Sequence, residues 1–85
     1  MEVIKVAIAD DHQIFRKGVI LSLRPFNNIK FVLEAENGNE LLANMPVAEP
    51  DVVLMDLRMP MKDGIETTKL LSKQYPHVNV IVLSM

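Results

Sequence analysis

Val52-Val53-Leu54-Met55-Asp56 joins four consecutive apolar residues to one acid, and Pro60 follows shortly after. β-branched residues favour an extended strand, and a run that is apolar on both faces is typical of a strand inside a parallel sheet. Open α/β sheets place their ligand sites at the carboxyl ends of such strands. The sequence therefore predicts that Asp56 lies on a rigid strand end at a binding site, although an aspartate in this place also suits a simple turn.

Apolar runs and amphipathic stretches alternate along the whole chain of 85 residues. The expected strands cover 4–9, 30–36, 52–56 and 78–83, and the expected helices cover 12–23, 39–45 and 65–75. Such alternation predicts parallel pairing, right-handed crossovers and helices on both faces of the sheet. The expected fold is therefore α/β, a doubly wound parallel sheet in one domain or part of one, with strand 30–36 at an edge.

All three expected helices have an apolar face, which Leu41 and Leu42 form in the short helix 39–45. In helix 12–23 this face is formed by Phe15, Val19 and Leu23. Arg16 falls away from that face and is expected to point to solvent. In helix 65–75 the corresponding stripe is formed by Ile65, Thr68, Leu71 and Tyr75. For the short middle helix we expect Asn39 as the cap and an end before Pro46, where a loop begins.

Composition excludes several classes of protein. A net charge of −2 offers no basic surface for nucleic acid, and the absence of cysteine excludes disulfides and thiolate metal sites. No stretch approaches the length of an apolar membrane helix, and the first ten residues do not resemble a secretory signal. We therefore expect a cytoplasmic protein whose residues 1–85 contact neither membrane nor nucleic acid directly.

Three acids are expected to meet at one edge of the sheet. Asp10 and Asp11 follow strand 4–9, and Asp56 ends strand 52–56. These two strands are natural neighbours at a topological switch point, where the carboxyl ends of parallel strands share one edge. Adjacent carboxylates repel one another, and a hard divalent cation such as Mg²⁺ or Mn²⁺ is their usual partner. A site of this kind supports phosphoryl transfer to a carboxylate nucleophile.

Simpler interpretations remain for the same residues. Asp10 and Asp11 also suit the N-terminus of the helix that follows, and only the presence of Asp56 favours a metal site over a cap. His12 and His77 have no second histidine or cysteine nearby in the sequence. We therefore expect both histidines to be solvated surface residues and not ligands.

The order and spacing of several motifs resemble a bacterial two-component response-regulator receiver domain. The motifs are Asp10-Asp11 after the first strand, Asp56-Leu57-Arg58-Met59-Pro60 after the third, Asp63-Gly64, and an apolar run that ends in Ser84. The opening Ala9-Asp10-Asp11-His12-Gln13 is similar to the NarL/FixJ-like subfamily, which usually carries a C-terminal helix-turn-helix DNA-binding domain. The resemblance covers residues 1–85 and implies a flavodoxin-like receiver fold.

The resemblance implies a role for each matching residue. Asp56 would accept a phosphoryl group from a sensor histidine kinase, and Ser84 would hydrogen-bond that group. Asp11 would bind Mg²⁺ or Mn²⁺ directly, Asp10 would bind it through water, and Arg58 would bind it through its backbone carbonyl. The protein would then be a signalling module that acts on transcription through an output domain, and not an enzyme.

The resemblance also implies that the chain ends early. Helix 4, strand 5, helix 5 and a phosphate-binding lysine of the family would be missing, so that residues 1–85 would form the N-terminal two-thirds of a receiver domain. We then expect the strand order two-one-three-four and little or slow phosphorylation of the 85-residue chain. We also expect a homodimer that pairs through the exposed strand 78–84.

Two other functions stay open at this point. A metal-dependent phosphohydrolase with an aspartyl-phosphate intermediate would want a second acid two residues after the nucleophile, where this chain has Arg58. A non-phosphorylated interaction domain is the other alternative. Treatment with Mg²⁺ and acetyl phosphate, followed by an intact-mass measurement, separates these functions from phosphoacceptor signalling.

Overall fold

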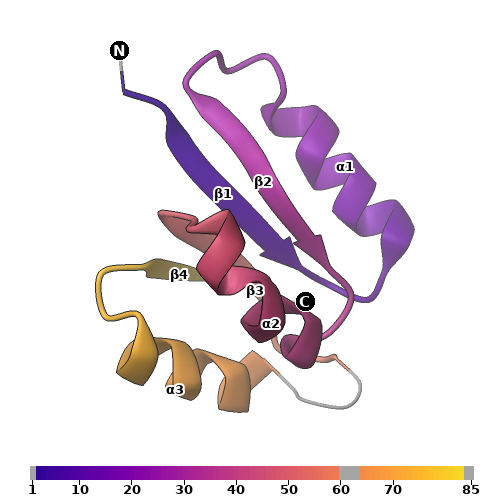
Figure 1. The fold of residues 1–85 in the computed structure, drawn as a ribbon. Coiled ribbons are helices and arrows are strands. Elements are labelled where there is room, and N and C mark those ends of the chain that lie inside the picture. Colours follow the sequence, from indigo (N-terminus) through magenta and orange to yellow (C-terminus); the bar gives the residue numbers. More distant parts are fainter. Residues whose placement is uncertain (1, 60–63, 84–85) are drawn as a thin grey trace.

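Strands and helices alternate through residues 2–59 and 64–83, the part of the chain that the computed structural model describes (Figure 1). The elements are β1 (Ile4–Ala9), α1 (Gln13–Leu23), β2 (Ile29–Ala35), α2 (Gly38–Ala48), β3 (Val52–Asp56), α3 (Gly64–Gln74) and β4 (Asn79–Leu83). Every strand pair is parallel, and the order across the sheet is β2-β1-β3-β4. These findings confirm the doubly wound parallel sheet and the edge position of β2.

Apolar side chains pack on both faces of this sheet, because helices cover both (Figure 1). Under α1 the buried residues are Val6, Ile8 and Leu54, with Val19, Ile20 and Leu23 of the helix packed against them. Under α2 and α3 a larger core contains Ala7, Ala9, Leu41, Met45, Val53, Met55 and Leu71. The two central strands are therefore buried at their carboxyl halves, which makes their ends rigid.

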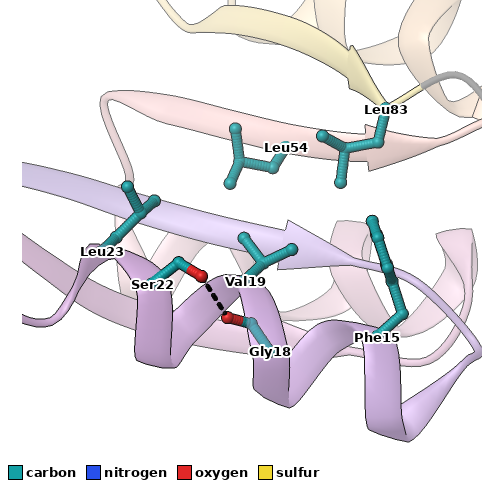
Figure 2. A pocket seen from close by; sticks show the side chains of 7 residues that line it. All are labelled: Phe15, Gly18, Val19, Ser22, Leu23, Leu54 and Leu83. Carbon is teal, nitrogen blue, oxygen red and sulfur yellow. Dashed lines mark hydrogen bonds between the residues drawn. The ribbon is translucent and has the colours of Figure 1, made fainter.

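The apolar face of α1 covers the sheet only in part. Val19 and Leu23 pack against the core as expected, but Phe15 remains 38% exposed. Figure 2 shows an open cavity beside this helix, lined by Phe15, Gly18, Val19, Ser22, Leu23, Leu54 and Leu83. Its volume is about 520 Å³. The face of the sheet between α1 and β4 is thus apolar and accessible in the described part of the chain.

Arg16 is buried, which contradicts the expectation that it points to solvent. Its Nη1 donates to the Asp10 carbonyl oxygen at 2.6 Å, and its Nε donates to Glu34 Oε1 at 3.1 Å. A guanidinium tolerates burial when charged and carbonyl acceptors take its N–H groups, as they do here. Burial alone would raise the pKa of Glu34, but the hydrogen bonds and charges of Arg16 and Lys17 outweigh it and hold that pKa below its ordinary value. Arg16 therefore ties α1 to the ends of β1 and β2.

The cap of α2 lies two residues earlier than the sequence suggested. The cap is Asn37 and not Asn39, because Asn37 Oδ1 accepts from the Glu40 backbone N–H at 2.8 Å. The Glu40 side chain in turn accepts from the Glu36 backbone N–H at 3.0 Å. The first bond satisfies a backbone donor that the helix leaves unpaired, and the second ties Glu36, the residue before the cap, to the first turn of the helix.

The same helix also continues past the proline that was expected to end it. Pro46 lies inside α2, which runs on to Ala48. Proline removes one backbone donor, and near the end of a helix this loss affects only the last turn. The helix then closes at Glu49, whose backbone is left-handed (φ 46°) and whose N–H donates to the Met45 carbonyl at 2.9 Å. The loop expected between Pro46 and Pro50 is therefore shorter than predicted.

The buried face of α3 differs by one position from the predicted stripe. Its buried residues are Gly64, Thr67 and Leu71. Ile65, which was expected to face the core, is 54% exposed, and Thr68 is only partly buried. Tyr75 packs against the core as expected. The shift arises because Gly64 lies directly against the backbone of β3, so the helix turns its smallest residue inward.

β4 forms the other edge of the sheet within the described residues, as the strand order predicted. Its apolar side chains are only partly covered: Ile81 is 52% exposed and Val82 is 44% exposed. An edge strand also presents unpaired backbone groups on its free side.

In this part of the chain no helix combines the length and the apolar character that crossing a bilayer requires.

Candidate functional site

The two central strands place two buried aspartates side by side at their carboxyl ends, which form one edge of the sheet. β1 pairs in parallel with β3, and the pairing of Ala9 with Met55 brings the next residues, Asp10 and Asp56, side by side. Asp10 is 2% exposed and Asp56 is 4% exposed. Carboxylates are rarely buried to this extent without a partner, so this edge of the sheet is the candidate site.

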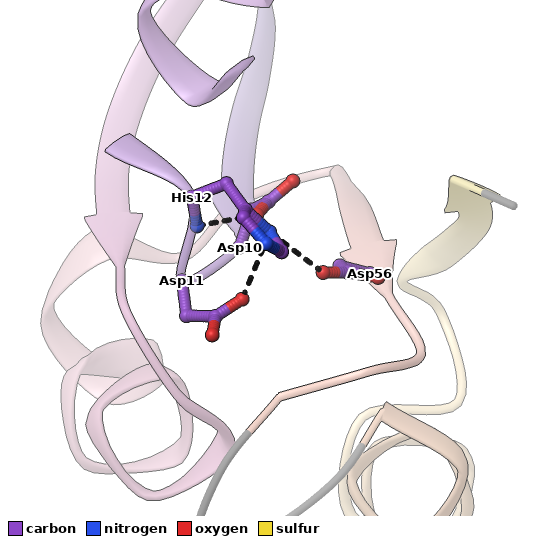
Figure 3. A group of neighbouring side chains, drawn as sticks. All are labelled: Asp10, Asp11, His12 and Asp56. Carbon is purple, nitrogen blue, oxygen red and sulfur yellow. Dashed lines mark hydrogen bonds and ion pairs between the residues drawn. The ribbon is translucent and has the colours of Figure 1, made fainter. Parts of the chain in front are cut away.

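Four side chains converge there, and Figure 3 shows them pointing toward one another. They are Asp10, Asp11, His12 and Asp56. One ligand atom from each lies within 4.8 Å of the others. The structure thus brings together the three acids that the topology predicted to meet, and it adds a histidine that was not expected among them.

Asp10 shapes the backbone that leads into α1. Its Oδ1 accepts from the His12 backbone N–H at 2.7 Å. His12 is the N-cap residue of α1, so this bond satisfies the backbone N–H at the cap position, although Asp10 itself lies two residues before the cap. α1 has no acidic residue in its first turn. Asp10 therefore helps to hold the start of α1, although the N-cap residue itself is His12.

His12 extends its imidazole over the acids although its side chain is 67% exposed. Its Nδ1 lies 3.1 Å from Asp11 Oδ1, 3.2 Å from Asp10 Oδ1 and 3.9 Å from Asp56 Oδ2. The expectation of a solvated surface residue is right about exposure and wrong about contact. The signal in the sequence was adjacency, because His12 directly follows the two acids.

The loop after β3 fixes the orientation of the Asp56 carboxylate. The Arg58 backbone N–H donates to Asp56 Oδ1 at 3.0 Å, and Met59 anchors the loop in the core at 7% exposure. The other oxygen, Oδ2, faces the His12 ring. The role expected of the Arg58 carbonyl stays a prediction, and Ser84 lies outside the described residues.

Gly64, the first residue of α3, packs directly beneath Asp56. Its N–H donates to the Leu57 carbonyl at 3.2 Å. A Cβ at this position would lie 2.3 Å from the Asp56 backbone oxygen and 2.6 Å from the Leu57 Cα, far closer than atoms can approach. The sequence suggested a turn here, but a glycine is needed for close approach of the helix to the site.

The donor set fits a small divalent cation. It contains carboxylate oxygens from Asp10, Asp11 and Asp56, which are the ligands that Mg²⁺ and Mn²⁺ prefer. A cavity of about 380 Å³ opens over Asp10, His12 and Asp56 and gives access from solvent. Its wall includes Ile14 and Phe15, so the site is charged at its base and apolar at its rim. Such an arrangement can hold a cation beside a carboxylate nucleophile.

Comparison with known proteins places this geometry in a family. The family model described as response regulator receiver domain matches residues 6–85. The chain is 42% identical over 84 residues to the transcriptional regulatory protein DegU of Brevibacillus brevis, covering 96% of this chain and 35% of that protein. It is also 48% identical over 80 residues to a protein-glutamate methylesterase of Carboxydothermus hydrogenoformans, covering 94% of this chain and 23% of that protein.

A solved structure agrees with these sequence matches. The Salmonella typhimurium response regulator RcsB superposes with a TM-score of 0.94 at 35% sequence identity. The superposition covers 100% of this chain and 44% of that one. The chain therefore spans less than half the length of each of these three proteins.

Proposed function

This chain belongs to the response regulator receiver domain family, and from that premise we propose that it accepts a phosphoryl group on Asp56 and passes the signal to an output domain. The observation that carries the proposal is the Asp56 carboxylate, buried at a strand end beside two further acids and held by the Arg58 N–H. A fixed carboxylate next to a cation site is the arrangement that aspartyl phosphorylation needs.

The proposed reaction is a transfer from a phosphohistidine of a sensor kinase. The phosphorus–nitrogen bond of the donor breaks, a bond forms between phosphorus and an Asp56 carboxylate oxygen, and the departing imidazole takes up a proton. The Arg58 N–H holds Oδ1 and thereby limits rotation of the carboxylate, which favours one approach of the donor. Ser84 is proposed to hydrogen-bond the transferred group.

A bound Mg²⁺ or Mn²⁺ would neutralise charge that builds up on the phosphoryl oxygens. We propose that Asp11 and Asp56 bind the ion directly, that Asp10 binds it through water, and that the Arg58 carbonyl contributes a further oxygen. The exposure of Asp11 supports this assignment, because Asp11 is the most exposed of the three acids and can reach an ion that arrives from solvent.

The output and the partners are proposed from the relatives. DegU is named as a transcriptional regulator and the methylesterase as an enzyme, so the shared segment serves more than one output. We propose a cytoplasmic, two-component regulator of transcription, with DNA contacted outside residues 1–85. A phosphohydrolase activity is disfavoured, because Arg58 stands where a second catalytic acid would be needed.

The proposal is tested by incubating the protein with Mg²⁺ and acetyl phosphate and measuring its intact mass. One added phosphoryl group is expected, and none is expected when EDTA replaces Mg²⁺. Release of phosphate with rapid turnover would point to a phosphohydrolase instead. An unchanged mass after prolonged incubation would favour a non-phosphorylated interaction domain.

Asp11→Asn is expected to weaken Mg²⁺ binding roughly ten- to hundredfold, because it replaces a charged ligand by a neutral one. Isothermal titration calorimetry measures the change. The matched control is Asp51→Asn, since Asp51 lies before β3 at the opposite edge of the sheet and an asparagine there keeps an oxygen for the Lys5 N–H. Equal Mg²⁺ affinity in wild type and Asp11→Asn would contradict the assignment.

We further propose that β4 pairs with a second copy of the chain through its free edge, across a two-fold axis. The exposure of Ile81 and Val82 supports this, because pairing would remove apolar surface from water. Ile81→Lys is expected to convert a dimer to a monomer in light scattering after size exclusion. Val47→Lys is the control, since Val47 is 87% exposed on α2. A wild-type chain that is monomeric at low micromolar concentration would contradict the pairing.

A further inference from the structure

We infer that His12 is a ligand of the cation that this site binds and that it shifts the preference of the site from Mg²⁺ toward first-row transition metals such as Co²⁺. The inference rests on the proposed metal site. It starts from the position of the imidazole, whose Nδ1 faces an oxygen of each of the three acids (Figure 3).

The spacing of these atoms is the spacing of ligands around one ion. Two ligands that lie about 2.1 Å from an ion and at right angles to each other are roughly 3 Å apart, and opposite ligands are roughly 4 Å apart. His12 Nδ1 is 3.1 Å from Asp11 Oδ1 and 3.2 Å from Asp10 Oδ1. It is 3.9 Å from Asp56 Oδ2. The separations from Asp11 Oδ1 and Asp56 Oδ2, which belong to the two acids proposed to bind the ion directly, fit atoms that share one coordination shell.

The backbone holds His12 in this place from both sides. Its N–H donates to Asp10 Oδ1 at 2.7 Å, and its carbonyl accepts from the Arg16 N–H at 2.9 Å, the first bond of α1. The side chain makes no capping hydrogen bond to that helix. Within the described residues the ring therefore contacts the acid cluster and does not cap α1.

The chemistry of an imidazole decides which ions gain from it. Mg²⁺ prefers oxygen ligands and keeps much of its water, so a nitrogen adds little to its binding. Co²⁺, Ni²⁺ and Zn²⁺ bind imidazole well, because its nitrogen is a ligand that first-row transition metals accept readily. A site with one imidazole among carboxylates is therefore expected to favour these ions over Mg²⁺ more strongly than carboxylates alone would.

The experiment compares Co²⁺ with Mg²⁺ in calorimetric titrations of wild type and His12→Gln. We expect the Co²⁺ dissociation constant to rise roughly tenfold or more and the Mg²⁺ constant to change less than about threefold. The control is His77→Gln, because His77 precedes β4 at the opposite edge of the sheet and is expected to affect neither ion. With Co²⁺ bound, the His12 ring protons should also show a large paramagnetic shift in proton NMR spectra, absent in His12→Gln.

The titrations separate failure of this inference from failure of the proposed metal site. If His12→Gln changes the dissociation constant of neither ion, or changes both constants by the same factor, His12 does not determine selectivity and the inference is overturned. In that case Asp11→Asn should still weaken the binding of both ions. If Asp11→Asn also leaves both affinities unchanged, the metal site itself is wrong.

Discussion

Asp56→Asn is expected to abolish phosphoryl incorporation from acetyl phosphate, as measured by intact mass. The amide oxygen of asparagine is a poor nucleophile, and an acyl phosphate cannot form on it. The change preserves size and one acceptor oxygen, so the hydrogen bond from the Arg58 N–H can persist. Asp56 is buried among acids, and loss of one negative charge there should leave the fold intact or stabilise it.

Two controls accompany this prediction. Asp51→Asn should incorporate phosphoryl at the rate of wild type, because its carboxylate lies at the other edge of the sheet. Circular dichroism of Asp56→Asn should show unchanged helix content, which separates loss of the acceptor from loss of structure. Phosphoryl incorporated by folded Asp56→Asn, and mapped to another residue by peptide mass, would overturn the assignment.

Gly64→Ala is expected to destabilise the fold strongly for the addition of a single methyl group. The new Cβ would meet the backbone of Asp56 and Leu57, which cannot rotate away as a side chain can. Either α3 or the end of β3 must move, and overpacking of this kind costs about 1–3 kcal/mol or more. For a domain of this size that lowers the melting temperature by roughly 5–20 °C. Mg²⁺ affinity should fall as well, because the displaced segment carries Asp56.

Gly18→Ala is the matched control and should act in the opposite direction. Gly18 lies inside α1, and a Cβ there would meet nothing within 4 Å. Alanine in a helix interior is favoured over glycine by roughly 1 kcal/mol, so the melting temperature should rise by a few degrees. Thermal unfolding by circular dichroism measures both variants. If Gly64→Ala melts at or above the wild-type temperature, the close approach of α3 to Asp56 is wrong.

The sequence predicted the sheet and its acidic edge because their signals are local. Val52 to Met55 form an apolar run that is typical of a buried strand. The expectation that this strand lies beside strand 4–9 rested on a topological switch point and on the resemblance to receiver domains, because chain order alone would place strand 30–36 between them. The meeting of Asp10 with Asp56 is a consequence of that topology. It needed no knowledge of side-chain contacts, and for this reason it could be stated before the structure was known.

Side-chain contacts between elements could not be predicted in the same way. Arg16 follows a helical period that places it off the apolar face, and only the acceptors at the ends of β1 and β2 explain its burial. Ile65 looks like a core residue by its chemistry, yet the close approach of Gly64 rotates α3 so that Ile65 is exposed. In both cases a contact with a distant segment outweighs the local pattern.

The order of the strands has a consequence for how the protein is made. Lys5 and Asp51, which link the starts of β1 and β3, are 46 positions apart in the chain. β1 can pair with β2 while the rest is still being synthesised, but its other edge must stay open until β3 emerges from the ribosome. Contacts so distant in sequence form late, because a long loop must close first. The nascent chain thus presents Asp10 and Asp11 without Asp56, and the site becomes complete only when β3 takes its place beside β1.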